Sequence, residues 1–316
     1  FDKELAFNTK VDESTGIYQF QGAMTVIDNE TGKVVAMIGG RSQDELQQTY
    51  SLNRGFQSFK QPGSSIKPLV IYTPALEEGY DANSTLTEID VKAAKKSTSE
   101  KISKMSGQKM SLRYAVEDSK NGCAYSLYNI ITPKVGLSYI ENMNFSKIVQ
   151  QDYTLSSGLG GLHHGTNTVE MANAYSTLDN HGEYRQADCI SSILDASGNE
   201  IYEEPESKTV YTRSASDQMT DILEGVLNSS AGTAKGLKWS SASDVAAAAK
   251  TGTTNDNNVA WFCGYTPYYT AGIWLCYDSM FTQMSGSASK IMWRDIMEKV
   301  HKVKKLKNKN LQKINA

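Results

Sequence analysis

The stretch QPGSSIKP at residues 61–68 contains a serine and a lysine three positions apart, Ser64 and Lys67. Residues with this spacing lie on one face of a helix, so a helix that begins here would place the hydroxyl beside the amine. Pro68 is compatible with a helix start, because proline has no N–H to donate. An apolar run follows and stops before Gly79, a suitable C-terminal cap. We therefore expect Ser64 at the N-terminus of a buried helix, where free N–H groups and the helix dipole favour developing negative charge.

This pair of side chains predicts a nucleophile and its base. A serine is a weak nucleophile until a base removes its proton. A lysine can be that base only if its pKa lies well below the free value of about 10.4. Burial and a nearby second cation both lower the pKa of a lysine. The pair therefore predicts a partly desolvated Lys67 beside another positive group. The alternative for this motif alone is a capped helix with a solvated lysine.

Two further motifs follow along the chain: residues 119–121 read SKN, an S-x-N sequence, and residues 250–253 read KTGT. Their order after Ser64 and Lys67 is typical of penicillin-recognising enzymes. With these motifs the chain resembles the transpeptidase domain of penicillin-binding proteins, from about Gln21 to about Asp278. The flanking sequences resemble the bifunctional class A branch of that family: QGAMTVIDNETGKVVAMIGG, QPGSSIKP, KTGTTND and WFCGYTP.

The resemblance implies a role for each side chain in these motifs. Ser64 attacks the substrate carbonyl and forms an acyl-enzyme, Lys67 is the base, and Ser119 passes the proton to the leaving amine. The backbone N–H groups of Ser64 and Thr253 form the oxyanion hole, in which each donor typically contributes about 3–4 kcal/mol. Lys250 completes the catalytic set and, with its neighbours, offers a cation and hydroxyls to a free carboxylate. The expected substrate-binding residues are Asn121, Thr251, Gly252 and Thr253.

The implied substrate is a peptidoglycan stem peptide that ends in D-Ala-D-Ala, which β-lactam antibiotics mimic. A second stem-peptide amine takes the acyl group, and no metal or cofactor is required. The net charge of −3 does not suggest a nucleic-acid partner. No run of 18 apolar residues exists, so no transmembrane span is expected. Because the chain does not begin with Met, we expect an excised fragment of a longer protein. By resemblance, that protein lies at the extracytoplasmic face of the bacterial cell membrane, with its membrane anchor and glycosyltransferase domain in the missing N-terminal part.

Three classes of function compete on the sequence alone. The first is the transpeptidase, the second is a hydrolase (a D,D-carboxypeptidase or a β-lactamase), and the third is a β-lactam-binding sensor domain. A class A β-lactamase needs a carboxylate to activate the deacylating water. The usual E-x-x-L-N is absent, because the sequence after Glu170 does not fit it. This disfavours a β-lactamase.

The strand-forming segments come from both ends of the chain. Turn residues join two β-rich runs at 24–28 and 34–38, and three more strands are expected at 245–251, 259–265 and 271–277. Together they predict an α+β fold: one antiparallel sheet flanked by helices, with a mostly helical subdomain at about 63–180. The site should lie in the cleft between the two parts. The expected boundaries are an N-terminal linker (1–22), the transpeptidase domain (23–301) and a basic C-terminal tail (302–316).

Several local features are predicted from capping and turn residues. Ser111, Ser214 and Ser287 should each open a helix, and Asn167 with Glu170 should form a capping box. Residues 81–110 are expected to form a surface excursion and 189–203 a hairpin. The four cysteines are interpreted as buried hydrophobes. With a turn centred on Tyr268, Cys263 faces Ile273, so no bridge to Cys276 is expected. The adjacent histidines 163 and 164 lack metal-ligand spacing.

Overall fold

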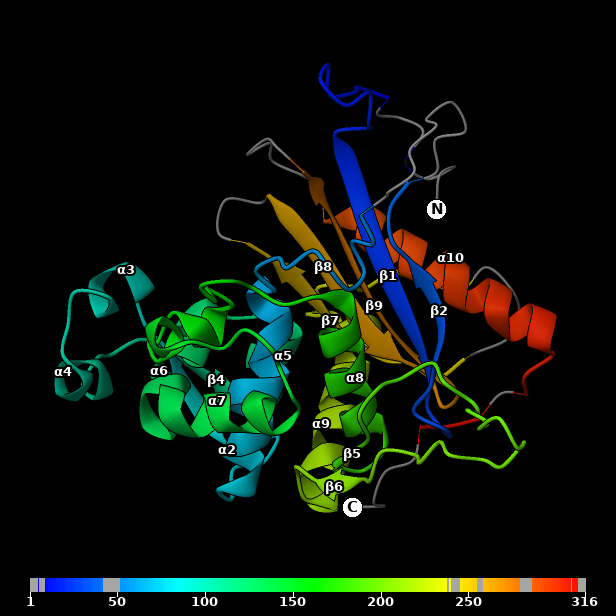
Figure 1. Cartoon of the computed structure of the whole chain (residues 1–316). Coiled ribbons are helices and arrows are strands. Elements are labelled where there is room, and N and C mark those ends of the chain that lie inside the picture. The colour runs from blue at the N-terminus through cyan, green and yellow to red at the C-terminus, as the bar shows by residue number, and fades with distance from the viewer. Residues whose placement is uncertain are drawn as a thin grey trace.

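A five-stranded antiparallel sheet forms the centre of the molecule, in the order β2–β1–β9–β8–β7 (Figure 1). The computed structural model describes residues 5, 9–41, 52–237, 239, 245–254, 258–278, 286–307 and 309–311. The strands of the sheet are β1 (Phe20–Asp28), β2 (Val34–Ile38), β7 (Ala248–Thr253), β8 (Val259–Tyr265) and β9 (Tyr269–Tyr277). The predicted sheet is confirmed, and both of its outer strands, β2 and β7, come from hairpins at opposite ends of the chain.

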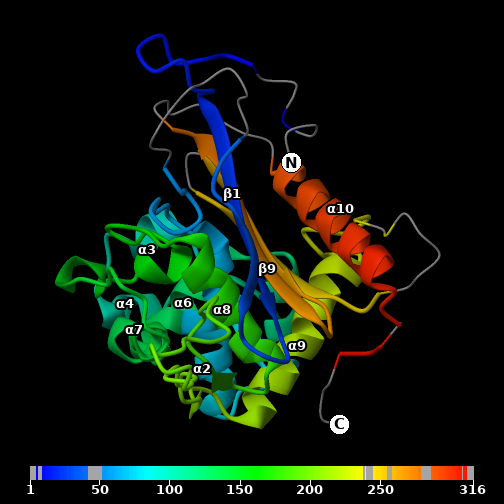
Figure 2. The same ribbon diagram turned by 45° about the vertical axis from the view of Figure 1, so that its right-hand side comes forward.

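Helices cover both faces of this sheet. Helix α8 (Thr168–Asp179) packs on β1, β8 and β9, and α10 (Ser287–Lys304) packs on β8 and β9 from the opposite side (Figure 2). Strands β1, β8 and β9 are accordingly buried along almost their whole length. The indole N–H of Trp293 donates to the carbonyl of Ala271 at 3.0 Å and thereby fixes α10 to β9.

The remaining helices form the second part of the molecule, at the β7 edge of the sheet (Figure 1). The larger ones are α5 (Leu112–Glu117), α6 (Asn121–Ile131), α7 (Pro133–Asn142) and α9 (Arg213–Asn228). The smaller elements are β3 (Thr85–Glu88), α3 (Val91–Ala94), α4 (Ser99–Ser103), β4 (Gln108–Ser111), η3 (Gln150–Asp152), η4 (Ser157–Leu159), β5 (Glu183–Tyr184) and β6 (Lys208–Thr209). The predicted α+β architecture is confirmed, but the predicted end of the helical subdomain near residue 180 is wrong. Helix α8 lies inside that range and packs on the sheet, whereas α9 lies beyond it and packs on α2 (Thr73–Glu77) and α5.

The central helix of this part runs from Gly63 to Glu77 and changes its winding along the way. It consists of the 3₁₀ segment η1 (Gly63–Ile66), the π segment η2 (Pro68–Tyr72) and α2 (Thr73–Glu77). The hydroxyl of Tyr175 donates to the carbonyl of Ser65, and that of Tyr211 to the carbonyl of Leu69, both at 2.6 Å. These bonds satisfy backbone acceptors in a segment without regular α-helical bonding. Gly79 follows the end of the helix with φ +90°, as predicted for its cap.

The structure corrects the expected boundaries at both ends of the sheet domain. Residues 20–22, which the sequence assigned to the linker, belong to β1. The tail expected from residue 302 begins inside α10, which continues to Lys304. Leu311, which lies within the predicted basic tail, is buried. The remainder of the tail, including Lys313, and most of residues 1–8 lie outside the described residues.

Two of the predicted helix caps are confirmed and two differ. Ser111 accepts a hydrogen bond from the N–H of Tyr114, and Asn167 accepts one from Glu170. The cap of α9 is Thr212 instead of Ser214, which lies in the first turn. The cap of α10 is Gly286 instead of Ser287, which is the first residue of that helix. The Glu170 carboxylate does not complete a capping box. It accepts from the Ser146 backbone and hydroxyl and from the Thr166 hydroxyl, and so fixes the chain before α8.

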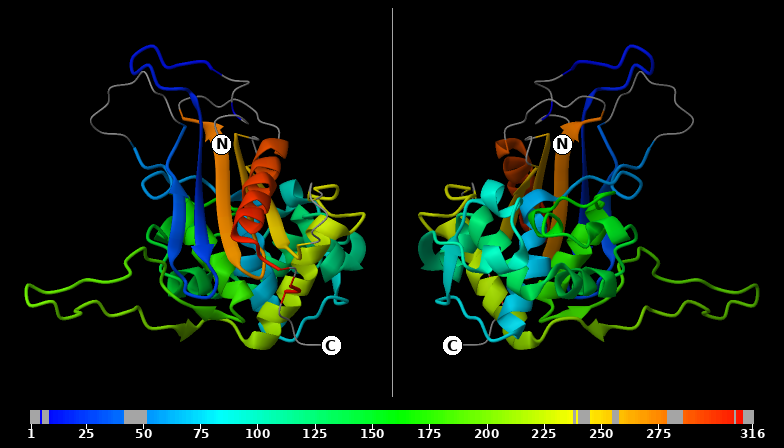
Figure 3. Two further views of the ribbon diagram at one scale, coloured as in Figure 1. Left: turned by 90° about the vertical axis from the view of Figure 1, so that its right-hand side faces the viewer. Right: turned by 90° about the vertical axis from the view of Figure 1, so that its left-hand side faces the viewer.

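Other local predictions were wrong in part. Residues 81–110 form short helices and a two-stranded sheet of β3 and β4. Residues 189–203 form the predicted hairpin only in its central part, where Leu194 bridges Glu200 and the N–H of Ile201 donates to the carbonyl of Ile193 at 2.8 Å. The segment extends away from the body (Figure 3). Cys189 is exposed, whereas the other three cysteines are buried, and all four are free. Cys263 pairs with Gly272, one residue away from the expected register.

Candidate active site

Ser64 lies where the central helix meets the outer strand β7. The two backbones approach so closely that a Cβ on Gly63 would lie 2.4 Å from the carbonyl oxygen of Thr253. A Cβ on Gly252 would lie 2.4 Å from the carbonyl oxygen of Pro62. Gly63 also has φ +53°, a conformation that side chains disfavour. The glycines of QPGS and KTGT therefore let Ser64 lie directly against the strand that carries Thr253.

Lys67 lies behind Ser64 and is completely buried. Its Nζ donates to the carbonyl of Ser119 at 2.9 Å and to Oδ1 of Asn121 at 2.7 Å. Burial lowers the pKa of Lys67 to about 7, although Glu88 acts in the opposite direction. The predicted desolvated lysine is therefore present. Among the described residues, none is hydrogen-bonded to the Ser64 hydroxyl, which leaves it free to turn toward either the amine or a substrate.

Ser119 lies in the sharp turn between α5 and α6 and has φ 58°, in the left-handed region. This conformation directs its carbonyl to Lys67 and its hydroxyl to Lys250. The next helix begins at Asn121, and the Glu88 carboxylate accepts from the N–H groups of its first turn at Gly122 and Cys123. An acidic group at a helix N-terminus is stabilising, so Glu88 holds the S-x-N turn in position.

Lys250 is the second cation that the sequence predicted beside Lys67. It is completely buried, and its Nζ donates to Oγ of Ser119 at 2.8 Å and to the carbonyl of Thr251 at 3.1 Å. The pKa of Lys250 lies well below its usual value, first because of burial and second because of the charge of Lys67. The two lysines thus bind Ser119 from two sides: Lys67 donates to its carbonyl and Lys250 to its hydroxyl.

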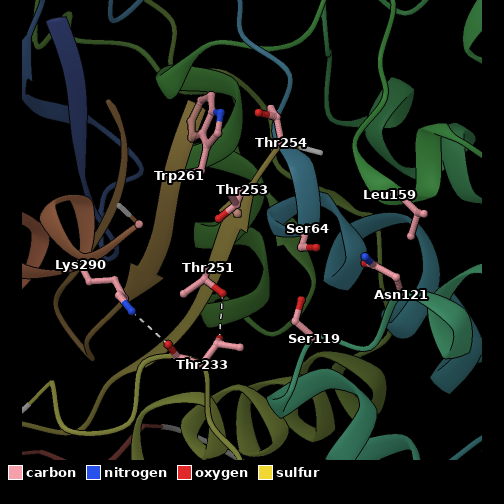
Figure 4. A pocket seen from close by; sticks show the side chains of 12 residues that line it. Ser64, Ser119, Asn121, Leu159, Thr233, Thr251, Thr253, Thr254, Trp261 and Lys290 are labelled. Atoms are coloured by element: carbon pink, nitrogen blue, oxygen red, sulfur yellow. Dashed lines mark hydrogen bonds between the residues drawn. The ribbon is translucent and has the colours of Figure 1, made fainter. Parts of the chain in front are cut away.

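A pocket of about 390 Å³ opens in front of these groups (Figure 4). Six of the predicted site residues line it, namely Ser64, Ser119, Asn121, Thr251, Gly252 and Thr253. Lys67 and Lys250 do not line it and lie behind its wall. The structure thus brings together all eight predicted residues. It adds six that the sequence did not indicate as site residues: Leu159, Thr233, Thr254, Trp261, Gly286 and Lys290.

The polar groups on the β7 side of the pocket are linked to one another. The hydroxyls of Thr233 and Thr251 are hydrogen-bonded at 2.8 Å, and Nζ of Lys290 donates to the Thr233 carbonyl at 3.1 Å. On the other side, the amide nitrogen of Asn121 points toward Ser64 in Figure 4. The nucleophile thus lies between a hydroxyl-rich wall with a cation and an amide donor. The described residues contain no group of three or more His, Cys, Asp or Glu that could hold a metal ion.

Comparison with known proteins identifies relatives over most of the chain. Residues 22–298 match the family described as "Penicillin binding protein transpeptidase domain". Penicillin-binding protein 4 of Bacillus subtilis (strain 168) is 31% identical over 260 residues, which cover 82% of this chain and 40% of that protein. Penicillin-binding protein 1A of Clostridium tetani (strain Massachusetts / E88) is 31% identical over 324 residues, covering 95% of this chain and 40% of that protein. This chain thus spans less than half the length of either relative.

Solved structures share the fold. PonA1 from Mycobacterium tuberculosis, determined in complex with penicillin V, matches with a TM-score of 0.77 at 20% sequence identity, covering 100% of this chain and 85% of that one. Penicillin-binding protein 1A from Haemophilus influenzae matches with a TM-score of 0.74 at 20% identity, covering 95% of this chain and 49% of that one. Within the described residues, no helix is both long and apolar enough to cross a membrane.

The family match and the geometry agree on the same part of the molecule. The matched range begins in β1, ends in α10 and contains all three motifs. These motifs meet at one pocket, although they lie far apart in the chain. The resemblance expected from the motifs is thereby confirmed, and the chain belongs to the family of penicillin-binding protein transpeptidase domains.

Proposed function

We propose that this chain is a peptidoglycan D,D-transpeptidase, which cross-links stem peptides through an acyl-enzyme on Ser64 and is acylated there by β-lactams. The observation that carries this proposal is the pair of buried lysines behind the pocket. Lys67 has a pKa of about 7, and Lys250 donates to the Ser119 hydroxyl. A base that titrates near the working pH is the best compromise between being deprotonated and accepting a proton strongly.

In the proposed acylation step, neutral Lys67 takes the proton of Ser64 as its Oγ bonds to the carbonyl carbon of the penultimate D-Ala. The N–H groups of Ser64 and Thr253 stabilise the oxyanion. The close contact of Gly63 with the Thr253 backbone supports this pairing. The carbon–nitrogen bond to the terminal D-Ala then breaks, and Ser119 relays the proton held by Lys67 to the leaving amine, which returns Lys67 to its neutral form. Asn121 orients the peptide amide, and Thr251, Gly252 and Thr253 border the position of the leaving residue.

In the second step, the amine of a neighbouring stem peptide attacks the ester carbonyl and the bond from that carbon to Ser64 Oγ breaks. The proton lost by the amine passes through neutral Lys67 to Ser64 Oγ. The described pocket wall offers no group that could activate water in the way a class A β-lactamase does. None of the described lining residues has a carboxylate that could activate water. The Glu170 carboxylate is already bound to Ser146 and Thr166. These observations support a transpeptidase over a β-lactamase.

The proposed partners are stem peptides that end in D-Ala-D-Ala and β-lactam antibiotics. One solved relative is described as a complex with penicillin V, which supports the second of these. The proposed location is the extracytoplasmic face of the bacterial cell membrane, where the substrate lies.

The test is the mass of the intact protein after treatment with benzylpenicillin. Wild-type protein should gain one penicilloyl group, on the peptide that contains Ser64, and Ser64→Ala should gain none. Ser65→Ala is the matched control, because Ser65 is the neighbouring hydroxyl and donates to the carbonyl of Pro62 instead. An adduct on folded Ser64→Ala, or on a peptide without Ser64, would contradict the proposal.

A further inference from the structure

The pocket contains a cation that the three motifs do not supply. Of the described residues that line it, Lys290 alone is positively charged. Lys250, the lysine of KTGT, is completely buried, and its Nζ is bound to Ser119 and to the Thr251 carbonyl. The charge that faces the pocket on the β7 side is therefore that of Lys290 (Figure 4).

The Lys290 ammonium can donate further hydrogen bonds to a ligand. It makes one hydrogen bond to the described residues, to the Thr233 carbonyl at 3.1 Å, and an ammonium group has three donors. The hydroxyl of the same Thr233 is bonded to the hydroxyl of Thr251. An anion placed here would meet the ammonium and two hydroxyls from three different elements: α10, the loop before β7, and β7 itself.

The position of Lys290 in its helix is unfavourable unless an anion binds nearby. Lys290 lies in the first turn of α10, and this turn contains no acidic residue. The N-terminus of a helix carries partial positive charge, so a lysine there is repelled by the dipole. Partial burial also lowers the pKa of Lys290. A bound carboxylate would offset both effects, because it stabilises the ammonium and interacts favourably with the helix N-terminus.

We propose that Lys290 binds the C-terminal carboxylate of the substrate, together with the hydroxyls of Thr251 and Thr233. Lys250 then has a different function: it holds and polarises the Ser119 hydroxyl. This inference rests on the proposed function, because a transpeptidase substrate and a penicillin both present a carboxylate on the leaving-group side. It makes Lys290 a specificity residue for acids over neutral analogues, and it changes the role that the sequence suggested for Lys250.

The experiment compares acylation rates for benzylpenicillin and its methyl ester, which lacks the charge. Lys290→Met should lower the rate with benzylpenicillin by about 10-fold to 100-fold, the range expected for a hydrogen bond to a charged group. The rate with the ester should change little. Lys290→Arg should keep most of the rate with the acid. Lys299→Met is the matched control, because Lys299 is an exposed lysine on the same helix, and both of its rates should equal those of the wild type.

Lys250→Met provides the contrast within the site. Because Lys250 contacts the Ser119 hydroxyl, its loss should lower the rates with acid and ester alike. Equal losses for both reagents in Lys290→Met, or no loss for either, would overturn the role of Lys290.

One measurement needs no variant and therefore does not depend on how the variants fold. In the wild type, added salt should slow acylation by the acid more than by the ester, since salt screens the charge pair. Equal salt effects would contradict the inference while leaving the proposed function intact. A wild type that forms no adduct with either reagent would instead overturn the proposed function, and this inference with it.

Discussion

At the scale of single residues, the protonation of Lys67 controls the chemistry. Its pKa of about 7 means that the amine is protonated below this pH and neutral above it. Only the neutral form can accept the Ser64 proton, so the acylation rate should rise with pH through about 7 and then level off. Stopped-flow measurement of the acylation rate from about pH 5 to about pH 9 would check this profile. This range extends about 2 pH units to either side of the expected transition.

Lys67→Arg serves as the control for this profile. Arginine keeps the charge but stays protonated throughout the accessible range. Its acylation rate should fall by at least about 10², the usual loss of a general base, and the transition near pH 7 should disappear. A variant with a wild-type rate, or with the same pH profile, would show that Lys67 only supports the structure.

At the scale of elements, the contact between the central helix and β7 aligns the site. Gly252→Ala would place a Cβ 2.4 Å from the carbonyl oxygen of Pro62 and 2.8 Å from Oγ of Ser65, so the helix and the strand must separate. Loss of one oxyanion-hole donor typically costs 10²–10³-fold, and we expect a loss of about this size in acylation by Gly252→Ala. Quantitative penicillin labelling of the folded protein would measure it.

Gly79→Ala is the matched control for this variant. Gly79 also has a conformation that favours glycine, with φ +90°, but a Cβ there would have nothing within 4 Å. Its alanine variant should lose about 1–2 kcal/mol of stability from left-handed strain and keep its acylation rate. If both variants lost stability and neither lost acylation, the close approach at Gly252 would have no part in catalysis.

The elements also show how far the sequence could predict the structure. The caps at Ser111 and Asn167 were correct because capping depends on residues within one turn of each other. The predicted cap of α9 was wrong because Thr212 and Ser214 could each accept a hydrogen bond from the first turn. Which of them does so depends on where the backbone enters the helix, and the sequence does not indicate this. Lys290 was missed for a related reason. Its helix pattern predicts which face is buried, but its place beside Thr233 depends on how α10 packs across the sheet.

The motif residues were predictable for a different reason. Ser64, Lys67, Ser119 and Lys250 carry chemistry that requires particular residue types in a particular order, and the structure brings them together. The order does not indicate which lysine faces the solvent side of the pocket. Which lysine reaches the pocket depends on how deeply each one is buried, and burial is decided only when the chain folds. In the folded chain Lys250 is completely buried behind the pocket wall.

At the scale of the whole molecule, the lifetime of the acyl-enzyme separates the candidate functions. Because no described lining residue has a carboxylate to activate water, the adduct with benzylpenicillin should persist for many minutes. A mass-spectrometric chase after removal of free antibiotic would measure its decay. Rapid return of free protein with repeated hydrolysis would indicate a hydrolase. A stable adduct without turnover of a D-Ala-D-Ala-type thioester in the presence of an amine would indicate a sensor domain.

The pairing of β1 with β9 has a consequence for how the protein folds during its synthesis. Phe20 pairs with Tyr277 and Asp28 with Tyr269. Strand β1 therefore cannot complete its hydrogen bonds until β9 has been synthesised. During synthesis, the hairpin of β1 and β2 must remain without its central neighbour until the chain has been made as far as β9. Contacts so distant in sequence slow folding, because the loop between them must close first. The apolar faces of β1 are exposed during this interval, which makes the unfinished chain vulnerable to aggregation. The time between the emergence of β1 and that of β9 is therefore when this protein most needs protection.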